Sequence, residues 1–482
     1  MIADMEELAD LLILLAKYDV MRRHDGGTKT TKPNLKDRSL TSVISLKKDL
    51  PKLFNFFNDV ELPGKKSRPR SKVMIPLHSL MELSFQNKSS NDFPLSLSQD
   101  TCGVAFDQST FVHIQSFEDI VQVMSSMQKP KRLSLKGSDG KNYDVMCKSQ
   151  DDLRKDKRLM EFNQVVNHCL RQDGEARKRQ LYVRTYSVTP LGHDVGLLEW
   201  VPNVITLRSA LNPLIKRKLT VMGSKNPAAM SNAEWSRHAP KKTDSKERKL
   251  EIFRNIFLPR HPPVLSDWFR KNFPEPCGWY AARLGFSRTC AVMSMVGFVL
   301  GLGDRHAENI LLDMSSGDVF HVDLNLLFNK GEELPIPELV PFRLTHNMLD
   351  GFGPLSYEGP FRKACEVTMR ILRDKREMLL TLLQTFLHDP LVEWRKCQAT
   401  QQERQLGRYM DSAKLTDEEF QKQMAVLIRT YINARLSGCI ASPKYYAKNS
   451  PLNVEKQVEN LIKLATEDSL LSQMFVGWCP FL

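Results

Sequence analysis

The stretch from Gly301 to Asn325 constrains this chain more than any other, because it combines short apolar runs with a turn and several polar side chains. Its sequence is G-L-G-D-R-H-A-E-N-I-L-L-D-M-S-S-G-D-V-F-H-V-D-L-N. The apolar run Ile310 to Leu312 predicts a strand, and Gly317-Asp318 is typical of a turn. From Phe320 to Asn325 apolar and polar residues alternate, which predicts a second strand. We therefore expect a β-hairpin here.

Four polar residues around this expected hairpin suit phosphoryl-transfer chemistry. Asp304, His306 and Asn309 precede the first strand, and Asp323 lies in the second, so one end of the hairpin would gather acid, amide and acid groups. Carboxylate and amide oxygens suit Mg²⁺, which shares its oxygen ligands with phosphates, and a further Asp can orient a hydroxyl nucleophile. Each residue alone is more typical of a turn, cap or surface position, whereas the combination favours a functional site.

The motifs of this stretch resemble those of a known family. D-R-H-x-x-N and H-V-D are similar to motifs of the phosphatidylinositol-3-kinase-related protein kinases. A narrower resemblance, to the DNA-damage checkpoint kinases of that family, rests on P-F-R-L-T-H-N-M (Pro341 to Met348), C-E-V-T-M-R (Cys365 to Arg370) and F-L-H-D-P-L-V-E-W (Phe386 to Trp394). Asn325, where most relatives have Gly, supports the same branch. The resemblance covers nearly the whole chain from Val73 onward.

The resemblance implies an active serine/threonine protein kinase that uses ATP and Mg²⁺ or Mn²⁺. Asp304 would orient the substrate hydroxyl or accept its proton, and His306 would stabilise the transferred phosphoryl group. Asn309 and Asp323 would bind the metal ion. The substrates would be proteins with Ser or Thr followed by Gln, in DNA-damage and replication-stress signalling. A dedicated partner protein would bind through regions outside this chain.

The composition is that of a soluble intracellular protein. Its 482 residues suffice for about two or three domains with sizeable cores. The nine Cys are scattered without any C-x-x-C, which predicts reduced thiols rather than a disulfide framework or a zinc site. The longest apolar run, Cys290 to Leu302, is interrupted by Gly and Ser and is too short to span a bilayer. The acidic N-terminus is unlike a signal peptide.

The net charge of +13 leaves nucleic-acid, membrane and acidic partners open. The basic residues lie in separate runs, such as Lys65 to Arg70 and Lys241-Lys242, without the interleaved aromatic residues of a stacking platform. These runs are typical of solvated loops, and the first also fits a nuclear localisation signal. We therefore expect a nuclear protein with no direct sequence-specific binding to nucleic acid and no membrane association.

Residues 73–203 are rich in predicted strands and correspond to the N-lobe of an α+β, two-lobed kinase fold with a small antiparallel sheet. The strands expected here are Lys131 to Lys136, Lys141 to Lys148, Leu181 to Val188 and Val195 to Val201. The first two flank G-S-D-G, a hairpin turn signal. Asp144, Met146 and Lys148 should share one face of the second strand. A helix is expected from Leu153 to Leu170.

The candidate phosphate-binding residues lie in this N-lobe. It contains no G-x-G-x-x-G, which excludes the ordinary protein-kinase phosphate loop. The resemblance gives that role to S-S-M-Q-K-P (Ser125 to Pro130), with Ser126 at the contacting position, and an ordinary polar turn is an equal alternative. The resemblance also makes Lys148 the lysine that neutralises ATP phosphates, with Asp151 and Asp156 as its supporting acids. The alternative is an exposed lysine beside an acidic helix N-terminus.

The end of the last N-lobe strand is the expected hinge. By resemblance, backbone groups of Glu199, Trp200 and Val201 would bond the adenine of ATP, and Trp200 would line its pocket. An indole offers a flat apolar face to a purine, although a buried core Trp is an alternative.

Residues 204–395 are predicted to be mostly helical and correspond to the C-lobe. Residues 219–247 form a polar insert that we expect to be a flexible loop. Leu326 to His346 contains three prolines and is expected to be an extended loop in the activation-loop position. The helices expected in this lobe are Trp268 to Phe273, Cys290 to Leu300 and Phe361 to Phe386.

The flanking segments resemble the regions that surround such kinases. Residues 1–72 are expected to be the tail of a FAT-like helical region, with a helix over 1–25 and then a basic linker that has a weaker helical patch near Leu53. Residues 396–449 match the variable regulatory segment and contain a predicted helix from Phe420 to Leu436. Residues 450–482 resemble the short FATC segment. Its aromatic end should pack on the kinase, because an exposed apolar patch favours aggregation.

Two residues depart from the family pattern. Ala307 replaces a Gly, and Leu324 replaces a Phe. Neither change removes a metal ligand or a charged group. Ala307 predicts an ordinary backbone conformation at this position, one that does not need glycine. Leu324 keeps an apolar side chain, although a smaller one than Phe. We expect an effect on the reaction rate and not on the reaction type.

Two alternatives to a protein kinase remain open. A pseudokinase scaffold is the first, although every catalytic position carries a competent residue. A phosphoinositide kinase is the second, and it must hold a multiply charged headgroup with clustered basic residues in the activation loop. The stretch from Asp323 to His346 has only Lys330 and Arg343 as basic residues, together with three Glu. This balance favours a protein substrate.

Overall fold

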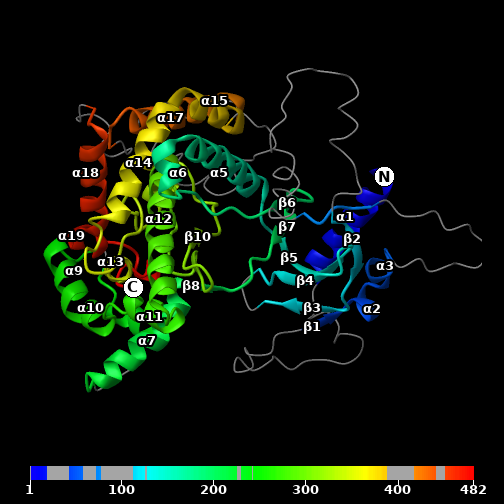
Figure 1. Ribbon diagram of the computed structural model, residues 1–482, viewed down its shortest axis with the longest axis horizontal. Coiled ribbons are helices and arrows are strands. Elements are labelled where there is room, and N and C mark those ends of the chain that lie inside the picture. The colour runs from blue at the N-terminus through cyan, green and yellow to red at the C-terminus, as the bar shows by residue number, and fades with distance from the viewer. Residues whose placement is uncertain are drawn as a thin grey trace, which may run out of the picture. The chain divides into compact units, whose positions relative to one another are not determined.

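The structure of the protein is a computed structural model that describes residues 2–18, 43–57, 72–76, 112–124, 128–224, 230–241, 243–387, 417–440 and 451–482. The chain forms two compact units, Met1–Met160 with Thr185–Pro202, and Glu161–Arg184 with Asn203–Leu482 (Figure 1). A sheet dominates the first unit and helices dominate the second, as expected for the α+β class. Helix α5 (Arg154–Gln172) passes from the first unit into the second after Met160.

A seven-stranded antiparallel sheet is the framework of the first unit. The strands pair in the order β1-β3-β4-β5-β7-β6, and β2 pairs with the later residues of β4. The strands are β1 (Val43–Ser45), β2 (Ile114–Phe117), β3 (Ile120–Val123), β4 (Lys131–Gly137), β5 (Asn142–Ser149), β6 (Val188–Pro190) and β7 (Val195–Glu199). The short helices α2 (Leu46–Asp49) and α3 (Pro51–Phe54) follow β1, and α1 (Ile2–Lys17) precedes it.

The hairpin of β4 and β5 forms at the predicted turn. Gly140 has a φ of 78°, a left-handed conformation that glycine adopts without strain, and its amide donates to the carbonyl of Gly137 at 2.9 Å. Asp144, Met146 and Lys148 share the half-buried face of β5, and the residues between them are buried. The predicted face of this strand is therefore confirmed.

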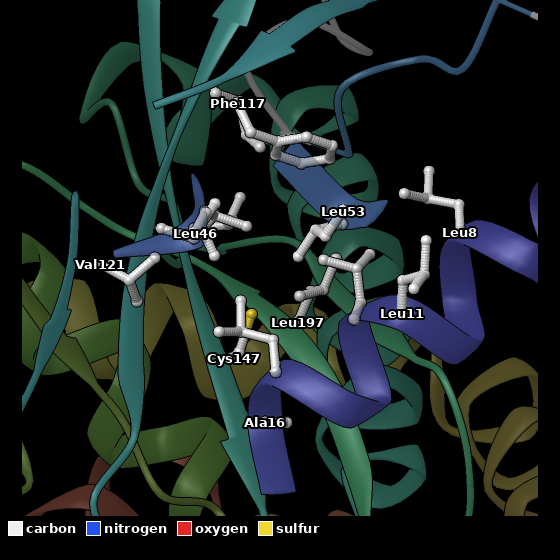
Figure 2. Close-up of a cluster of buried hydrophobic side chains, with 14 of the residues drawn as sticks. Leu8, Leu11, Ala16, Leu46, Leu53, Phe117, Val121, Cys147 and Leu197 are labelled. Carbon is white, nitrogen blue, oxygen red and sulfur yellow. The ribbon is translucent and has the colours of Figure 1, made fainter. Parts of the chain in front are cut away.

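The N-terminal helix α1 is part of the core of the first unit. Its Leu8 and Leu11 belong to one buried cluster with Cys147 of β5 and Leu197 of β7 (Figure 2). All four side chains are at most 8% exposed. A fully buried Leu contributes roughly 1.5–3 kcal/mol relative to an exposed one. The helix is therefore an integral part of this unit, and it ends at Lys17, before the end of the predicted helix over 1–25.

The prediction of a linker over residues 26–72 was wrong for residues 43–50, whereas the helical patch predicted near Leu53 is present as α3. This stretch forms β1, α2 and α3, and Ile44 of β1 pairs with Val121 of β3. Ile44, Leu46 and Leu53 are at most 1% exposed. So few apolar residues in a basic, polar stretch give only a weak periodic signal, and Ile44 and Leu46 are ordered by burial in the core of this unit.

The prediction of a strand from Leu181 to Val188 was also wrong, because β6 begins only at Val188. The backbone of Val183 forms its hydrogen bonds with the side chain of Asn167 and not with a neighbouring strand. Asn167 of α5 accepts from the amide of Val183 at 2.7 Å and donates to its carbonyl at 2.8 Å. The alternating burial of Leu181 and Val183 thus reflects packing of an extended segment, which the pattern alone could not distinguish from a strand.

The second unit is mainly helical and contains a three-stranded antiparallel sheet in the order β10-β9-β8. Its strands are β8 (Val204–Thr206), β9 (Ile310–Asp313) and β10 (Val319–His321). Before β9 lie α6 (Gly174–Lys178), α7 (Leu207–Val221), α8 (Asn232–His238), α9 (Lys246–Ile252), α10 (Leu258–Arg260), α11 (Leu265–Asn272) and α12 (Pro276–Leu300). After β10 lie α13 (His346–Phe352), α14 (Pro360–Asp374), α15 (Arg376–Leu387), α17 (Asp417–Leu436), α18 (Val454–Thr466) and α19 (Asp468–Leu471).

The central helix of this unit, α12, is longer than the predicted apolar run because it begins at Pro276. By length and composition it is the one helix among the described residues that could cross a membrane, yet 78% of its most apolar window is buried inside the fold. It ends at Gly301, whose φ of 61° closes the helix and starts the stretch that contains the predicted site. The other helices predicted in the C-lobe are also present, as α11, α14 and α15.

The hairpin predicted between Ile310 and Asn325 is confirmed, but its second strand is shorter than expected. β10 ends at His321, and Leu311 of β9 pairs with Phe320. Asp323 has a φ of 55°, which is incompatible with an extended strand. The alternation continues to Leu324, which is 1% exposed, although the ladder has already ended.

The polar insert over residues 219–247 was predicted as a loop, and that prediction was wrong for α8. Ser231 caps this helix by accepting from the amide of Glu234 at 3.3 Å, while the Glu234 carboxylate accepts from the amide of Ser231 at 2.7 Å. This reciprocal pair is a capping box. Trp235 is 5% exposed and supplies the helix with its buried anchor.

The remaining predictions fall into two groups: some concern residues that the structure describes, and others concern residues outside them. The helices predicted at 420–436 and 454–464 are present as α17 and α18, and the seven described Cys are free thiols. Ser125, Ser126 and Met127 lie outside the described residues. So do the basic run Lys65 to Arg70 and most of Phe386 to Trp394.

The Asn167 contact predicts a stability effect. We expect Asn167→Ala to lower the free energy of unfolding by about 1–3 kcal/mol, because the buried amide and carbonyl of Val183 lose their partner. Denaturant unfolding would measure the change. Gln164→Ala, an exposed amide on the same helix, is the control and should have little effect. Equal unfolding midpoints for the two variants would contradict the role of Asn167.

Candidate active site

The β9–β10 hairpin brings the four predicted residues of the motif to one end. Asn309 directly precedes β9, and its carbonyl accepts from the amide of Val322 at 3.1 Å, so that Asp323 follows beside it. The Asn309 side-chain amide donates to the carbonyl of Asp304 at 2.9 Å. The Nε2 atom of His306 lies 4.0 Å from an Asp304 carboxylate oxygen. The predicted gathering of these residues is thus present in the structure.

Both aspartates of this site have left-handed backbone conformations. The φ of Asp304 is 57°, and that of Asp323 is 55°. Such a conformation costs a non-glycine residue on the order of 1–3 kcal/mol and persists only where surrounding contacts enforce it. Ala307, in contrast, is buried without a positive φ, so the position tolerates the loss of Gly.

Arg305 is the contact that enforces this geometry. Its side chain is 3% exposed and donates to the carbonyl of Gly303 at 2.8 Å, to that of Val322 at 2.8 Å and to that of Asp323. One guanidinium therefore joins the loop that holds Asp304 to the segment that holds Asp323. The sequence placed Arg305 between Asp304 and His306 but gave no sign of this structural role.

The oxygen atoms of Asn309 and Asp323 fit the magnesium ion that the chemistry of the site implies. The Asn309 amide uses its nitrogen to bond Asp304, which leaves its oxygen as an acceptor. One Asp323 carboxylate oxygen accepts from Asn325 at 2.7 Å, and the carboxylate is exposed. No cluster of three His, Cys, Asp or Glu suited to a metal occurs among the described residues. Mg²⁺ does not require one, because it takes its remaining ligands from water and phosphates.

Burial shifts the protonation of Asp304 and His306 in opposite senses. Burial raises the pKa of Asp304, and the nearby His306 and Arg305 oppose this rise. Burial lowers the pKa of His306, and Asp304 opposes the fall. The His306 Nδ1 atom accepts from the amide of Glu308 at 3.2 Å, so the neutral ring carries its proton on Nε2. Asp304 thus gains proton affinity beside a neutral imidazole donor.

Glu338 is a residue of the site that the sequence did not reveal. Its carboxylate accepts from the amide of Asp304 at 2.9 Å, which supports the left-handed conformation of that residue. The other carboxylate oxygen packs closely against two glycines. A Cβ atom added to Gly303 would lie 2.7 Å from this oxygen and one added to Gly331 would lie 2.5 Å from it, so a side chain at either position would collide with Glu338. Burial raises the pKa of Glu338 to about 7. Glu338 lies in a proline-rich loop, where no sequence pattern predicts a hydrogen bond to the backbone of Asp304.

The C-terminal tail joins the site through Arg343. This side chain is 2% exposed and donates to the carbonyls of Trp478 at 2.7 Å, Cys479 at 2.6 Å and Leu482 at 3.1 Å. It also donates to the carbonyl of Arg305 at 3.2 Å. The prediction that the aromatic tail packs on the kinase is therefore confirmed. One buried guanidinium links that tail to Arg305, which contacts the loop that holds Asp304.

The predicted phosphate-binding lysine lies in the first unit. Lys148, near the end of β5, forms an ion pair with Asp151, and both side chains are at most 14% exposed. Gln150, between them, has a φ of 64°, which turns the chain so that Asp151 faces Lys148. Asp156 lies in the first turn of α5 and is 3% exposed. The expected pairing of Lys148 with a following acid is thus present for Asp151.

The expected hinge residues continue from β7. The carboxylate of Glu199 accepts from the amide of Ser187 at 2.9 Å, and the amide of Trp200 donates to the carbonyl of Asp144 at 3.2 Å. The guanidinium of Arg132 lies 4.8 Å from the centre of the Trp200 ring. Trp200 and Val201 are half-buried, so the alternative of a fully buried core Trp does not hold.

Comparison with known proteins decides the family. Residues 142–396 match the family described as "Phosphatidylinositol 3- and 4-kinase", and residues 451–482 match the FATC domain. The chain belongs to the phosphatidylinositol 3- and 4-kinase family. The first match contains Lys148, Asp304, Asn309 and Asp323, and the second contains α18 and the aromatic tail.

Individual relatives narrow the resemblance. The "Serine/threonine-protein kinase ATR" of Drosophila melanogaster is 41% identical over 417 residues, which cover 86% of this chain and 15% of that protein. The "Protein kinase rad3" of Schizosaccharomyces pombe is 39% identical over 412 residues, which cover 85% of this chain and 16% of that protein. The chain thus spans less than a fifth of the length of either of these curated relatives.

A solved structure supports the fold. The "FAT and kinase domain of CtTel1" is 28% identical, has a TM-score of 0.72, and is matched over 100% of this chain and 28% of its own. These findings confirm the predicted family, the narrower resemblance to its checkpoint kinases and the two-lobed α+β fold. The FATC match likewise confirms the nature of the C-terminal segment.

The contacts of Arg343 predict that its fork-shaped guanidinium stabilises the tail. We expect Arg343→Lys to lower the free energy of unfolding by about 1–3 kcal/mol, because an ammonium group cannot serve the same set of buried carbonyls. Thermal unfolding and limited proteolysis of the tail would measure this. Arg376→Lys, whose side chain is 41% exposed, is the matched control. An unchanged unfolding midpoint and cleavage rate in Arg343→Lys would refute the assignment.

Proposed function

We propose that the protein is an ATP- and Mg²⁺-dependent protein serine/threonine kinase of the ATR type. It phosphorylates Ser or Thr followed by Gln in DNA-damage and replication-stress checkpoint signalling. The observation that carries the proposal is the enforced left-handed conformation of Asp304 and Asp323 at one end of the β9–β10 hairpin, with Asn309 beside them. The similarity to kinases named ATR and rad3 supports the choice of branch.

The side chains of the catalytic loop have separate tasks in this proposal. Asp304 orients the substrate hydroxyl and accepts its proton, which the raised pKa of this carboxyl favours. His306 donates a hydrogen bond from Nε2 to the transferred phosphoryl group as charge develops there. Asn309 and Asp323 hold Mg²⁺, which neutralises charge on the phosphates when it is bound. Arg305 and Glu338 keep Asp304 in position and do not touch the substrate.

The first unit supplies the proposed ATP contacts. Lys148 neutralises ATP phosphates while Asp151 holds its ammonium group in place. Asp156 supports the same group from α5. Backbone groups of Glu199 and Val201 bond the adenine, and the half-buried ring of Trp200 lies against it. Ser126, which lies outside the described residues, covers the phosphates.

The charge of the activation segment favours a protein substrate. Of its two basic residues, Arg343 is buried and bonded to the carbonyls of the tail, so it is not accessible to a substrate. Glu332 and Glu333 remain in the segment with Lys330. A multiply phosphorylated headgroup requires clustered basic side chains, whereas a peptide with a neutral Gln does not.

The wider assignments follow from the same resemblance. We propose action in the nucleus, with recruitment by a partner of the ATR-interacting-protein type that binds outside this chain. Neither sequence-specific nucleic-acid binding nor membrane association is part of the proposal.

The catalytic assignment predicts that Asp304→Ala and Asp323→Ala remove activity without unfolding the protein. Loss of the proton acceptor should lower the rate about a hundredfold to ten-thousandfold, and loss of the metal ligand should have a comparable effect. Phosphate transfer, nucleotide affinity and melting temperature should be measured together. Asp374→Ala, an exposed Asp at the end of α14, is the control. Normal activity in either site variant would contradict the assignment and favour a pseudokinase scaffold.

The Lys148–Asp151 pair makes a second prediction. Lys148→Ala should raise the apparent KM for ATP by roughly tenfold to a hundredfold and lower the turnover, because a charge-assisted bond to phosphate is lost. Lys141→Ala, on the same hairpin with a side chain that is 77% exposed, is the control. An ATP titration identical to that of the control would make Lys148 an ordinary surface lysine.

The substrate class is tested by direct competition of substrates. Labelled phosphate incorporation should be compared between a Ser-Gln peptide, the same peptide with Ala in place of Gln, and phosphoinositide vesicles. We expect the Ser-Gln peptide to be labelled and the other two to be labelled weakly. Strong lipid labelling without preference for the Gln peptide would overturn the proposal.

A further inference from the structure

A groove of about 650 Å³ lies in the second unit, its lining includes none of the proposed catalytic side chains, and we call it the α8–tail groove. Three segments form most of its lining, namely α8 with the residues after it, the activation segment and the C-terminal tail, and Arg208 of α7 and Lys249 of α9 complete it. The first segment contributes Trp235 and Lys241, the second Pro335 to Pro337 and Leu339, and the third Gln473 to Gly477. A volume of this size is ordinary for a ligand-binding site.

The walls of this groove are fixed to one another. The amide of Leu339 donates to the sulfur of Met474 at 3.2 Å, which joins the activation segment to the tail. Trp235 packs edge-on against Phe481 with ring centres 5.4 Å apart, which joins α8 to the tail. The guanidinium of Arg208 lies 4.4 Å from the centre of the Trp235 ring. The groove is therefore formed before anything binds.

The surface of the groove is apolar and aromatic. Trp235 is buried on the wall, whereas Phe475 is 57% exposed although it belongs to a tail that is otherwise packed. Pro335, Ile336 and Pro337 form the facing wall. An exposed phenylalanine beside such a wall offers a contact for an apolar side chain.

The lining of the groove carries more positive than negative side chains. Among the described residues that line it, Arg208, Lys241 and Lys249 are basic and none is acidic. Arg208 is paired with Glu308 at 3.3 Å. Lys241 and Lys249 form no ion pair with any residue that the structure describes. Two ammonium groups that form no ion pair with a described residue, beside an apolar surface, are complementary to a ligand that is both acidic and apolar.

We propose that the α8–tail groove docks an acidic, apolar segment of the protein substrate, separate from the residues around the phosphorylated Ser or Thr. The proposal rests on the proposed function, because it names how that site selects its substrates. A protein segment fits better than a membrane, because the apolar wall at Trp235 lies within a concave site that a flat bilayer does not enter.

The groove is connected to the catalytic loop through the activation segment. Leu339 lines the groove, and the preceding residue Glu338 bonds the amide of Asp304. A segment bound in the groove therefore lies along the same stretch that holds the catalytic aspartate. Docking raises the local concentration of the phosphorylated residue. It should lower KM and leave kcat unchanged, since it adds no contact in the transition state.

The first test is direct binding to the 482-residue chain. A fluorescent peptide of alternating Glu and Leu or Phe residues should bind, and the same peptide with Gln in place of Glu should bind about tenfold more weakly. The double variant Lys241→Glu, Lys249→Glu should weaken the acidic peptide by about the same factor. Phe475→Ala should weaken both peptides. Lys246→Glu, an exposed lysine of α9 that does not line the groove, is the matched control.

The second test is kinetic. A Ser-Gln peptide that carries the acidic segment should show an approximately tenfold higher KM with the double variant and the same kcat. A short Ser-Gln peptide without the segment should be unaffected. A chain that binds the acidic peptide but labels no Ser-Gln peptide would refute the proposed function and leave docking supported.

Three outcomes would overturn the docking proposal. The first is equal affinity for the Glu and Gln peptides. The second is an acidic-peptide affinity that does not change in the double variant. The third is lysine-dependent binding to phosphatidylserine vesicles by a chain that does not bind the peptide, which would assign the two lysines to a membrane surface.

Discussion

The buried guanidinium of Arg305 is the contact on which the candidate active site depends. It bonds carbonyl groups on both sides of the hairpin, at Gly303 and at Val322 and Asp323. The two left-handed aspartates cost on the order of 1–3 kcal/mol each. Hydrogen bonds from a charged group contribute roughly 1.5–3 kcal/mol each. The bonds of Arg305 are therefore of the right size to offset the strain that the aspartates impose.

This arrangement extends beyond the hairpin through a second buried arginine. Arg343 bonds the carbonyl of Arg305 and three carbonyls of the C-terminal tail. A tail without catalytic groups thus becomes part of the support for the catalytic loop. The same tail supplies Met474 and Phe475 to the α8–tail groove, so the proposed catalytic loop and the proposed docking groove share one scaffold. Disturbing the tail should therefore affect both.

The first unit prepares its own candidate residues in a comparable way. The ion pair of Lys148 and Asp151 follows the left-handed turn at Gln150, at the end of a strand whose other face is buried. That buried face packs against α1, a helix at the opposite end of the sequence from the tail. Both units therefore place their polar groups at the ends of strands that an apolar core holds.

The sequence by itself predicted the β9–β10 hairpin and the proximity of Asp304, His306, Asn309 and Asp323, because turn residues, periodicity and motif spacing are local. The two-lobed α+β fold followed from the resemblance of these motifs to a known family. Only the tertiary structure decided the partners of Glu338 and Arg343, since these bonds join residues that are 34 to 139 positions apart. The structure likewise has no strand at Val183, where the sequence predicted one, and the backbone there bonds the side chain of Asn167. Local patterns report which residues are buried, whereas hydrogen-bond partners depend on where the chain returns.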